Sequence, residues 1–154
     1  MATIKVITDL ERIGDEATKI ARAAKNITER GVTTINHYET IRVMATSASN
    51  MLHDALDAFA RLDGKQAIKL IAQDEVVEHE FRSIMRTLIT FMMEDPRTIS
   101  GALDTLWVAK AIERIGDHAK NIAEYVIYIV EGKDIRHTDS VSYTHLRAHE
   151  TRGN

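Results

Sequence analysis

The segment ERIGDEATKIA at residues 11–21 returns almost unchanged as ERIGDHAKNIA at residues 113–123. The two copies agree at eight of eleven positions without a gap, and they lie 102 residues apart. A repeat at so long an offset indicates a duplicated unit that is larger than one helix. If the second copy ends a bundle of three helices, the first copy should end another. The first two helices of that other bundle would then lie upstream of Met1.

Long helices with few interruptions are expected throughout the chain. It contains one proline in 154 residues, and turn residues divide it into segments at Gly31, Asp63-Gly64, Asp95-Pro96 and Gly132. The later segments, about 37–62, 65–94 and 98–131, carry apolar residues every three or four positions, as core-facing helices do. Short turns between long helices make neighbours antiparallel. The predicted fold is all-α: an antiparallel three-helix bundle over residues 36–136, preceded by one helix at residues 1–31 that remains from a first repeat.

The first helix carries an apolar stripe of its own but has no helices before it to cover that stripe. Its members are Val6, Leu10, Ile13, Ala17, Ile20, Ala24 and Ile27. We therefore expect this helix to fold back on the other helices or to pair with another chain.

The last 18 residues differ from the rest of the sequence. After Arg136 the stretch HTDSVSYTHLRAHETRGN shows no helical periodicity and resembles translated adapter or vector sequence. A native disordered terminus is the alternative interpretation. We treat residues 137–154 as a non-native or disordered tail, and its histidines are not candidate ligands.

The composition excludes several classes of function. Hydrophobic residues make up 44% and charged residues 28% of the chain, a balance typical of soluble globular proteins. A net charge of -3 and eight aromatic residues give no basic, stacking surface for nucleic acid. Without a signal peptide or an apolar run of roughly 18 residues, a cytoplasmic location is the default expectation. The absence of cysteine means that any metal must be held by carboxylate, imidazole, amide or water ligands.

Each copy of the repeat carries two carboxylates four residues apart: Glu11 with Asp15, and Glu113 with Asp117. On a helix such a pair projects from one side, within reach of a shared cation. A solvated helix face would show the same pattern, since exposed charged arrays are common. A glycine inside a helix costs about 1 kcal/mol relative to alanine. The repetition of Gly14 and Gly116 beside the pairs therefore suggests that something approaches the backbone closely there.

A third carboxylate pair precedes the turn at the proline. Asp74 stands in the apolar stripe of its helix, with Glu78 one turn later at the edge, and an unpaired carboxylate there would be costly. Asp74 and Glu78 lie 22 and 18 residues before the proline. Glu113 and Asp117 lie 17 and 21 residues after it, so the four meet at one level of an antiparallel pair. Because packed like charges repel, the sequence predicts a divalent or trivalent metal ion there, with protonation or a salt bridge to Arg114 as alternatives.

An enzyme is the main alternative class. Di-iron carboxylate bundles use Glu-x-x-His pairs, and that spacing does not occur in this chain. His79 and His118 fall away from the carboxylate side of their helices and are expected to lie at the surface or to pack against a partner. The sequence therefore favours a protein that is not an enzyme. A metal-dependent carboxylate-bundle enzyme and a purely structural helical bundle remain the alternatives.

Several motifs together resemble those of the PhoU family. They are the duplicated E-x-x-x-D in its ERIGD context, MLHDALDAFARLD at residues 51–63 and TFMMEDPRTI at residues 90–99. The resemblance covers about residues 3–137. It implies two tandem three-helix bundles with carboxylate-rich metal clusters on their surfaces. The implied ligands are Asp74, Glu78, Glu113 and Asp117 for the second bundle, with Glu11 and Asp15 as half of the first site. This chain departs from the family's pattern because two helices of the first bundle are absent.

The resemblance also implies a function. Proteins similar to this chain are negative regulators of phosphate uptake and of phosphate-starvation signalling. They link the phosphate ABC transporter, through its ATPase subunit, to a phosphate sensor histidine kinase. We would accordingly expect a cytoplasmic adaptor that is peripheral at the membrane through its partners and forms a homodimer. Its metal would be iron, zinc, manganese or magnesium, since carboxylate sites accept several hard cations.

Overall fold

The computed structural model describes the backbone of residues 2–30 and 38–150 and the side chains of residues 3–30 and 38–133. Every regular element in this described part is helical. The elements are α1 (Ala2–Arg30), α2 (Tyr38–Arg61), α3 (Gly64–Glu94), the short 3-10 helix η1 (Pro96–Thr98) and α4 (Ile99–Glu150). The predicted all-α class is confirmed.

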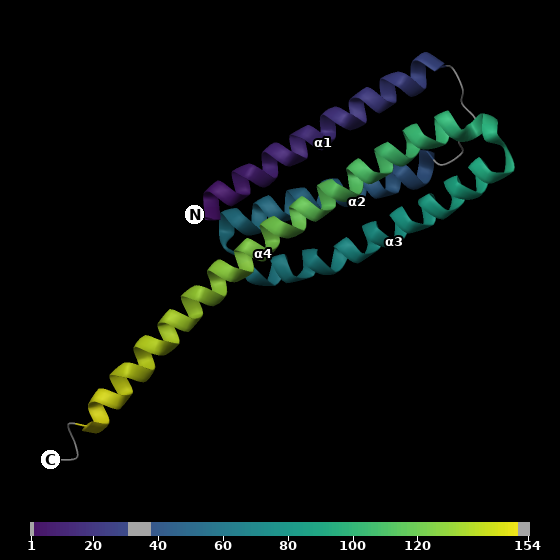
Figure 1. Ribbon diagram of the computed structural model, residues 1–154. Helices are drawn as coiled ribbons and strands as arrows, with labels where there is room; N and C mark the ends of the chain where they lie inside the picture. Colours follow the sequence, from purple (N-terminus) through teal and green to yellow (C-terminus); the bar gives the residue numbers. More distant parts are fainter. Residues whose placement is uncertain (1, 31–37, 151–154) are drawn as a thin grey trace.

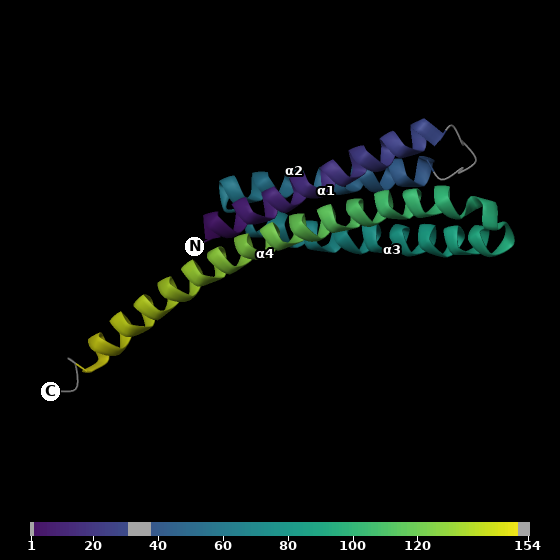
Figure 2. The same cartoon turned by 45° about the horizontal axis from the view of Figure 1, so that its top comes forward.

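Helices α2, α3 and the first part of α4 form an antiparallel bundle in which each helix contacts the other two (Figures 1 and 2). Their apolar stripes meet in one core. Its largest fully buried apolar side chains are Met44, Met51, Leu70, Val77, Leu88, Ile122 and Val126. These are the three- and four-residue stripes of the sequence, so the predicted three-helix bundle is present.

A side-chain cap in the turn between α2 and α3 marks the start of α3. Asp63 accepts a hydrogen bond of 3.1 Å from the backbone N–H of Gln66, which stabilises the first turn of α3. Gly64 follows the end of α2 at the predicted break and is also the first residue of α3. A Cβ atom there would lie 3.4 Å from Cγ1 of Val130, which is an ordinary van der Waals contact with α4.

The turn between α3 and α4 sets the height at which these helices pass one another. Asp95 ends α3, and its carboxylate accepts a hydrogen bond from the backbone N–H of Arg97 within η1. With Pro96 at the start of η1, the chain reverses within a few residues. Residues equally distant from this turn on α3 and α4 therefore lie at similar levels.

Helix α4 is longer than the sequence predicts. It continues through Gly132 to Glu150, beyond the bundle, so the predicted helix end near Glu131 is wrong (Figure 1). One interior glycine costs about 1 kcal/mol, which does not oblige a long helix to end. The predicted break at Gly31 lies outside the described residues. Nothing in the structure tests whether residues 137–154 are native to the protein, and that interpretation stays a prediction.

None of the described helices combines the length and the apolar character needed to cross a membrane.

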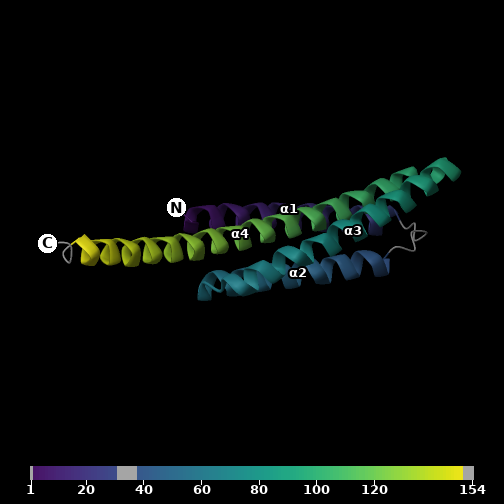
Figure 3. The ribbon, with the colours of Figure 1, turned by 90° about the horizontal axis from the view of Figure 1, so that it is seen from below.

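Helix α1 lies antiparallel along α4, and within the described residues it contacts no other helix (Figure 3). Val6, Ile13 and Ala23 are buried in this contact. The first helix therefore folds back on α4, one of the two expected outcomes, while Leu10, Ala17 and Ala24 of its predicted stripe stay exposed. A second side of α1 is left exposed. This free face consists of Ile7, Leu10, Gly14, Ala17, Ala21 and Ala24.

The two copies of the repeat pack on each other. Three contacts show the register: Lys5 with Tyr125, Asp9 with Asn121, and Glu16 with Arg114. In each of these contacts the two residue numbers add up to 130, as expected for antiparallel helices in a fixed register. The numbers of Gly14 and Gly116 also add up to 130. Gly14 therefore lies at the same level as Gly116, its equivalent in the other copy. α1 and the matching part of α4 are thus related by a local two-fold pseudosymmetry centred on the glycines.

Candidate metal centre

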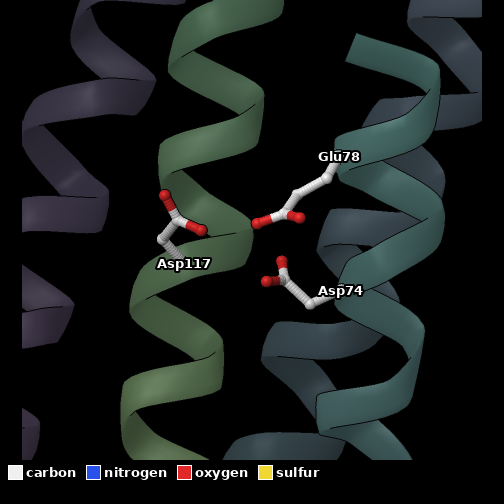
Figure 4. Close-up of side chains that lie close together, drawn as sticks. All are labelled: Asp74, Glu78 and Asp117. Carbon is white, nitrogen blue, oxygen red and sulfur yellow. The ribbon is translucent and has the colours of Figure 1, made fainter. Parts of the chain in front are cut away.

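Three carboxylates from facing helices converge at one level of the bundle. Asp74 and Glu78 come from α3 and Asp117 from α4, and one oxygen of each lies within 4.8 Å of the others. Figure 4 shows Asp74 and Glu78 extending from α3 towards α4, where Asp117 lies. Counting residues from the turn at Pro96 predicted a meeting of four carboxylates, and these three of them converge.

Asp74 is the most deeply placed of the three, with 1% of its surface exposed. Its Oδ1 is buried and accepts no hydrogen bond within the described part of the chain, while its Oδ2 lies 3.6 Å from Nζ of Lys120. Burial raises the pKa of Asp74 from 3.8 to about 6, helped by the charges of Asp117 and Glu78 and opposed by Lys120. The ionised form is therefore poorly stabilised by the protein alone, and a further cation would stabilise it.

Asp117 is electrostatically coupled to its neighbours. Its pKa is raised above 3.8 first by burial, and then by the charges of Glu113 and Glu78. Lys110 and Lys120 act in the opposite direction. The group therefore carries more negative charge than its immediate surroundings balance.

Gly116 explains how α3 and α4 come so close. A Cβ atom on Gly116 would lie 3.3 Å from Oδ1 of Asp74, so a side chain there would crowd the buried carboxylate. The expected close approach to the repeated glycine is confirmed here. At Gly14 no such approach is seen, because none of the residues that the structure describes lies within 4 Å of the corresponding position. Within the described residues, no helix covers α1 there as α3 covers α4.

The other predicted ligands lie outside the converging group. Glu113 is near enough to affect Asp117, but it pairs with Lys110 at 2.7 Å on its own helix. Glu11 and Asp15 are exposed on α1, and the structure brings no third ligand to them among the residues it describes. The six predicted side chains thus divide into three that meet, one at the edge and two apart.

The donor set suits a hard cation. Three carboxylates and no sulfur or imidazole donor match the preferences of magnesium, manganese and iron more closely than those of soft metals. The unpaired Oδ1 of Asp74 is an acceptor that such an ion would satisfy. Arg114, the alternative counter-ion, pairs instead with Glu16 of α1 at 3.7 Å. Metal binding by these residues remains a prediction, because the side chains define a suitable site and not its occupant.

A second polar cluster, between α1 and α4, was not predicted. Nδ1 of His118 lies 2.8 Å from Oδ1 of the buried Asp9, and Asn121 donates to the same oxygen at 3.3 Å. Glu16, also buried, accepts a hydrogen bond of 3.0 Å from Lys19. The sequence did hold a signal. The two copies differ at three of eleven positions. At two of these positions Glu16 is replaced by His118 and Lys19 by Asn121, and all four residues belong to this cluster.

Known proteins match most of the chain. The profile of the PhoU domain family matches residues 41–126. A protein of Pseudomonas putida named "Phosphate-specific transport system accessory protein PhoU homolog" is 49% identical over 133 residues, covering 86% of this chain and 52% of the relative. The Escherichia coli K12 protein with the name "Phosphate-specific transport system accessory protein PhoU" is 43% identical over 138 residues, or 89% and 56% of the two chains.

A solved structure agrees with the fold. The crystal structure of PhoU from Pseudomonas aeruginosa superimposes with a TM-score of 0.81 at 46% sequence identity, over 85% of this chain and 62% of that chain. The present chain therefore spans somewhat more than half the length of the curated relatives that it matches.

Proposed function

This chain belongs to the PhoU family, and on that premise we propose that it is a regulatory adaptor of phosphate uptake. In this proposal it acts as a negative regulator of phosphate uptake and of phosphate-starvation signalling, and it is not an enzyme. The observation that carries the proposal is the 49% identity over 133 residues to a relative named as a phosphate-specific transport system accessory protein.

The proposed partners are the ATPase subunit of the phosphate ABC transporter and a phosphate sensor histidine kinase. Both would be met at the cytoplasmic side of the membrane. Support comes from the names of the relatives, which place them with the phosphate-specific transport system.

The proposed cofactor is a divalent or trivalent ion held by Asp74, Glu78 and Asp117, with Glu113 as a further ligand. Because two of these residues lie on α3 and two on α4, the ion would tie the helices together and fix the surface that they offer to a partner. Glu11 and Asp15 would form half of a second site. That site needs another helix placed against α1 as α3 is placed against α4, and without such a helix Glu11 is available for an ion pair.

A second copy of the chain is the proposed cover for the free face of α1. The residues of α4 equivalent to this face are all buried in the bundle: Ala109, Ile112, Gly116, Ala119, Ala123 and Val126. Their counterparts on α1 are exposed. Glu11 and Arg22 flank the free face three turns apart, and the described part of the chain pairs neither of them with an opposite charge. In an antiparallel pair of α1 helices, Glu11 would meet Arg22 of the partner subunit, which supports a homodimer.

Complementation tests the regulatory role. A Pseudomonas putida strain lacking its PhoU homolog would receive this chain, the full-length relative or an empty vector. We expect the chain to restore, at least in part, the repression of phosphate-starvation genes in phosphate-rich medium. A chain that is expressed and folded but behaves like the empty vector would contradict the proposal.

A carboxylate-bundle enzyme would use the same acidic group. It is separated from the adaptor by oxygen consumption after ferrous iron is added to the purified chain. We expect no consumption beyond that of free iron. Turnover that disappears in Asp117→Asn would favour the enzyme.

A further inference from the structure

Three of the four carboxylates at the proposed metal site already have a basic partner. The pairs are Asp74 with Lys120 at 3.6 Å, Glu78 with Arg82 at 3.6 Å, and Glu113 with Lys110 at 2.7 Å. A metal ion entering this site would meet side chains whose charge is partly balanced. Its affinity must therefore depend on these basic residues as well as on the ligands.

One of these pairs differs from the others in its connectivity. Lys110 and Arg82 each hold a carboxylate on their own helix, three or four residues away. Lys120 belongs to α4, whereas Asp74 belongs to α3. Among the described residues, this is the ion pair that joins the two helices at the site. It does so at the most buried carboxylate of the group.

Lys120 thus does two things expected of the metal ion. It brings positive charge to the buried Asp74, and it connects α3 to α4. Oδ1 of the same carboxylate still accepts no hydrogen bond in the described structure, so the single lysine leaves the group incompletely satisfied. A divalent ion bound between the three carboxylates would satisfy it more fully.

We propose that Lys120 competes with the metal ion for Asp74, holding this carboxylate when the site is metal-free and leaving it when the ion binds. This inference rests on the proposed metal site. The ion and the ammonium are both positive and would stand within a few ångströms of one another, so they repel strongly. The lysine side chain is 36% exposed, and its flexible stem allows the ammonium to move into water.

The internal repeat provides an independent comparison. The counterpart of Lys120 in the first copy is Thr18, whose hydroxyl donates to the backbone oxygen of Gly14 on its own helix. The lysine is therefore not a constant part of the repeated motif. It occurs in the copy in which a buried aspartate from another helix faces the glycine.

Release of Lys120 would change the surface near the site. In the metal-free state its charge is largely compensated by Asp74, whereas in the metal-bound state a free ammonium faces solvent. Occupancy of a partly buried site would then be visible to a partner protein as a change in surface charge.

Manganese binding tests the competition directly. Affinity for Mn²⁺ would be measured by titration calorimetry, or from the electron paramagnetic resonance signal of free Mn²⁺. Lys120→Met keeps an unbranched side chain of similar length and removes its charge. We expect it to lower the dissociation constant for Mn²⁺ by about tenfold or more. Lys120→Arg retains the charge and should stay close to the wild type.

The matched control is Lys69→Met on α3, which changes the net charge equally. Lys69 is exposed and has no ion pair within the described residues. The dissociation constant of the Lys69→Met variant for Mn²⁺ should stay within about twofold of the wild-type value. Equal or weaker Mn²⁺ binding by Lys120→Met would overturn the competition. If neither the wild type nor Lys120→Met binds Mn²⁺, the proposed metal site falls as well.

Amine labelling tests the release in the unaltered chain. Acetic anhydride would be applied with and without Mn²⁺, and the modification of each lysine would be quantified by mass spectrometry. We expect Lys120 to react faster when Mn²⁺ is present, while Lys69 reacts at the same rate. Unchanged or slower labelling of Lys120 at saturating Mn²⁺ would overturn the release even if every variant failed to fold.

Discussion

Gly116 leaves room for Asp74: a Cβ atom on the glycine would stand 3.3 Å from Oδ1 of the carboxylate. Gly14 occupies the same place in the same motif, yet a Cβ atom there would meet no described atom within 4 Å. The difference arises because α3 packs on one copy of the motif and, among the described helices, none packs on the equivalent side of the other. One glycine therefore serves close packing, whereas the other lies open on α1.

Alanine at the two glycines should have opposite effects on stability. At concentrations low enough to keep the chain monomeric, Gly14→Ala should raise the free energy of unfolding by about 1 kcal/mol, since alanine favours the helix and no described residue lies within 4 Å of the new Cβ atom. Gly116→Ala gains the same helix preference but crowds a buried carboxylate, and we expect a net loss on the order of 1 kcal/mol. Urea unfolding of both variants beside the wild type measures this. Equal stabilisation by both would contradict the packing described at Gly116.

The fold followed from short-range features of the sequence. Apolar periodicity located the helices, and Asp63 and Asp95 marked the turns. The level at which the carboxylates meet followed as well. Asp74 and Asp117 lie almost equally far from Pro96 along the chain. Residues equally far from the turn between two antiparallel helices lie at the same level and close together. These inferences need only regular helix geometry.

The remaining details depend on side-chain choices that sequence spacing does not determine. Glu113 has the right level for the site but turns to Lys110 on its own helix. Lys120 reaches Asp74 only because α3 lies on that side of α4. The contact between Asp9 and His118 required knowing that α1 packs on α4 with the two copies antiparallel. In each case a partner from another element, or a competing neighbour, decides the outcome.

Stability of the metal-free chain should depend on pH through Asp74. Its pKa is about 6 in the folded protein and 3.8 in its ordinary state, so the folded state holds the proton more tightly. The contribution of Asp74 to stability is therefore fully present below about pH 4 and is lost as pH rises through about 6. The shift corresponds to about 3 kcal/mol as an order of magnitude. Asp117, whose pKa is also raised, acts in the same direction.

Asp74→Asn isolates this effect, because asparagine cannot ionise. In the presence of a chelator, the variant should become more stable than the wild type as pH rises above about 6, and the difference should shrink towards pH 4. Denaturant unfolding at a series of pH values measures it. Asp15→Asn, at an exposed position, serves as control. A stability difference that does not change with pH would contradict the raised pKa of Asp74.

Metal content should distinguish the two copies of the repeat. Asp117 lies in the converging group, whereas its equivalent Asp15 is exposed on α1. We expect Asp117→Asn to lose most of the bound metal and Asp15→Asn to retain it, because only the first removes one of three clustered ligands. Elemental analysis of protein purified without a histidine tag provides the measurement. Equal loss in both variants would mean that the copies contribute equally.

The attachment of α1 should depend on Asp9. This buried carboxylate lies 2.8 Å from Nδ1 of His118, and Asn121 also donates to it. Asp9→Ala leaves both partners without their acceptor, so the opening free energy of α1 should fall by about 1–3 kcal/mol. Hydrogen exchange along Ala2–Arg30, read by mass spectrometry, would show it. Thr8→Ala, next to Asp9 but exposed, should leave exchange almost unchanged. Similar protection of α1 in Asp9→Ala would mean that apolar contacts hold the helix.

The last prediction concerns dimerisation through the free face of α1. Its exposed members include Ile7 and Leu10, with small residues following towards Ala24, so two copies could approach closely along it. We expect the chain to be dimeric in sedimentation experiments at concentrations on the order of 10 µM. Ala17→Glu places a charge in the middle of the face. It should raise the dimer dissociation constant by about tenfold or more, since the buried carboxylate would have no partner.

Thr8→Glu is the matched control, because it adds the same charge to α1 away from the free face. It should leave the dissociation constant within about twofold of the wild type. The paired charges give a second arm. Glu11→Arg alone should weaken the dimer by placing it opposite Arg22 of the partner subunit, and Glu11→Arg combined with Arg22→Glu should restore it. A wild-type chain that sediments as a monomer at these concentrations would exclude a second copy as the cover. The exposed residues of α1 would then need a partner of another kind.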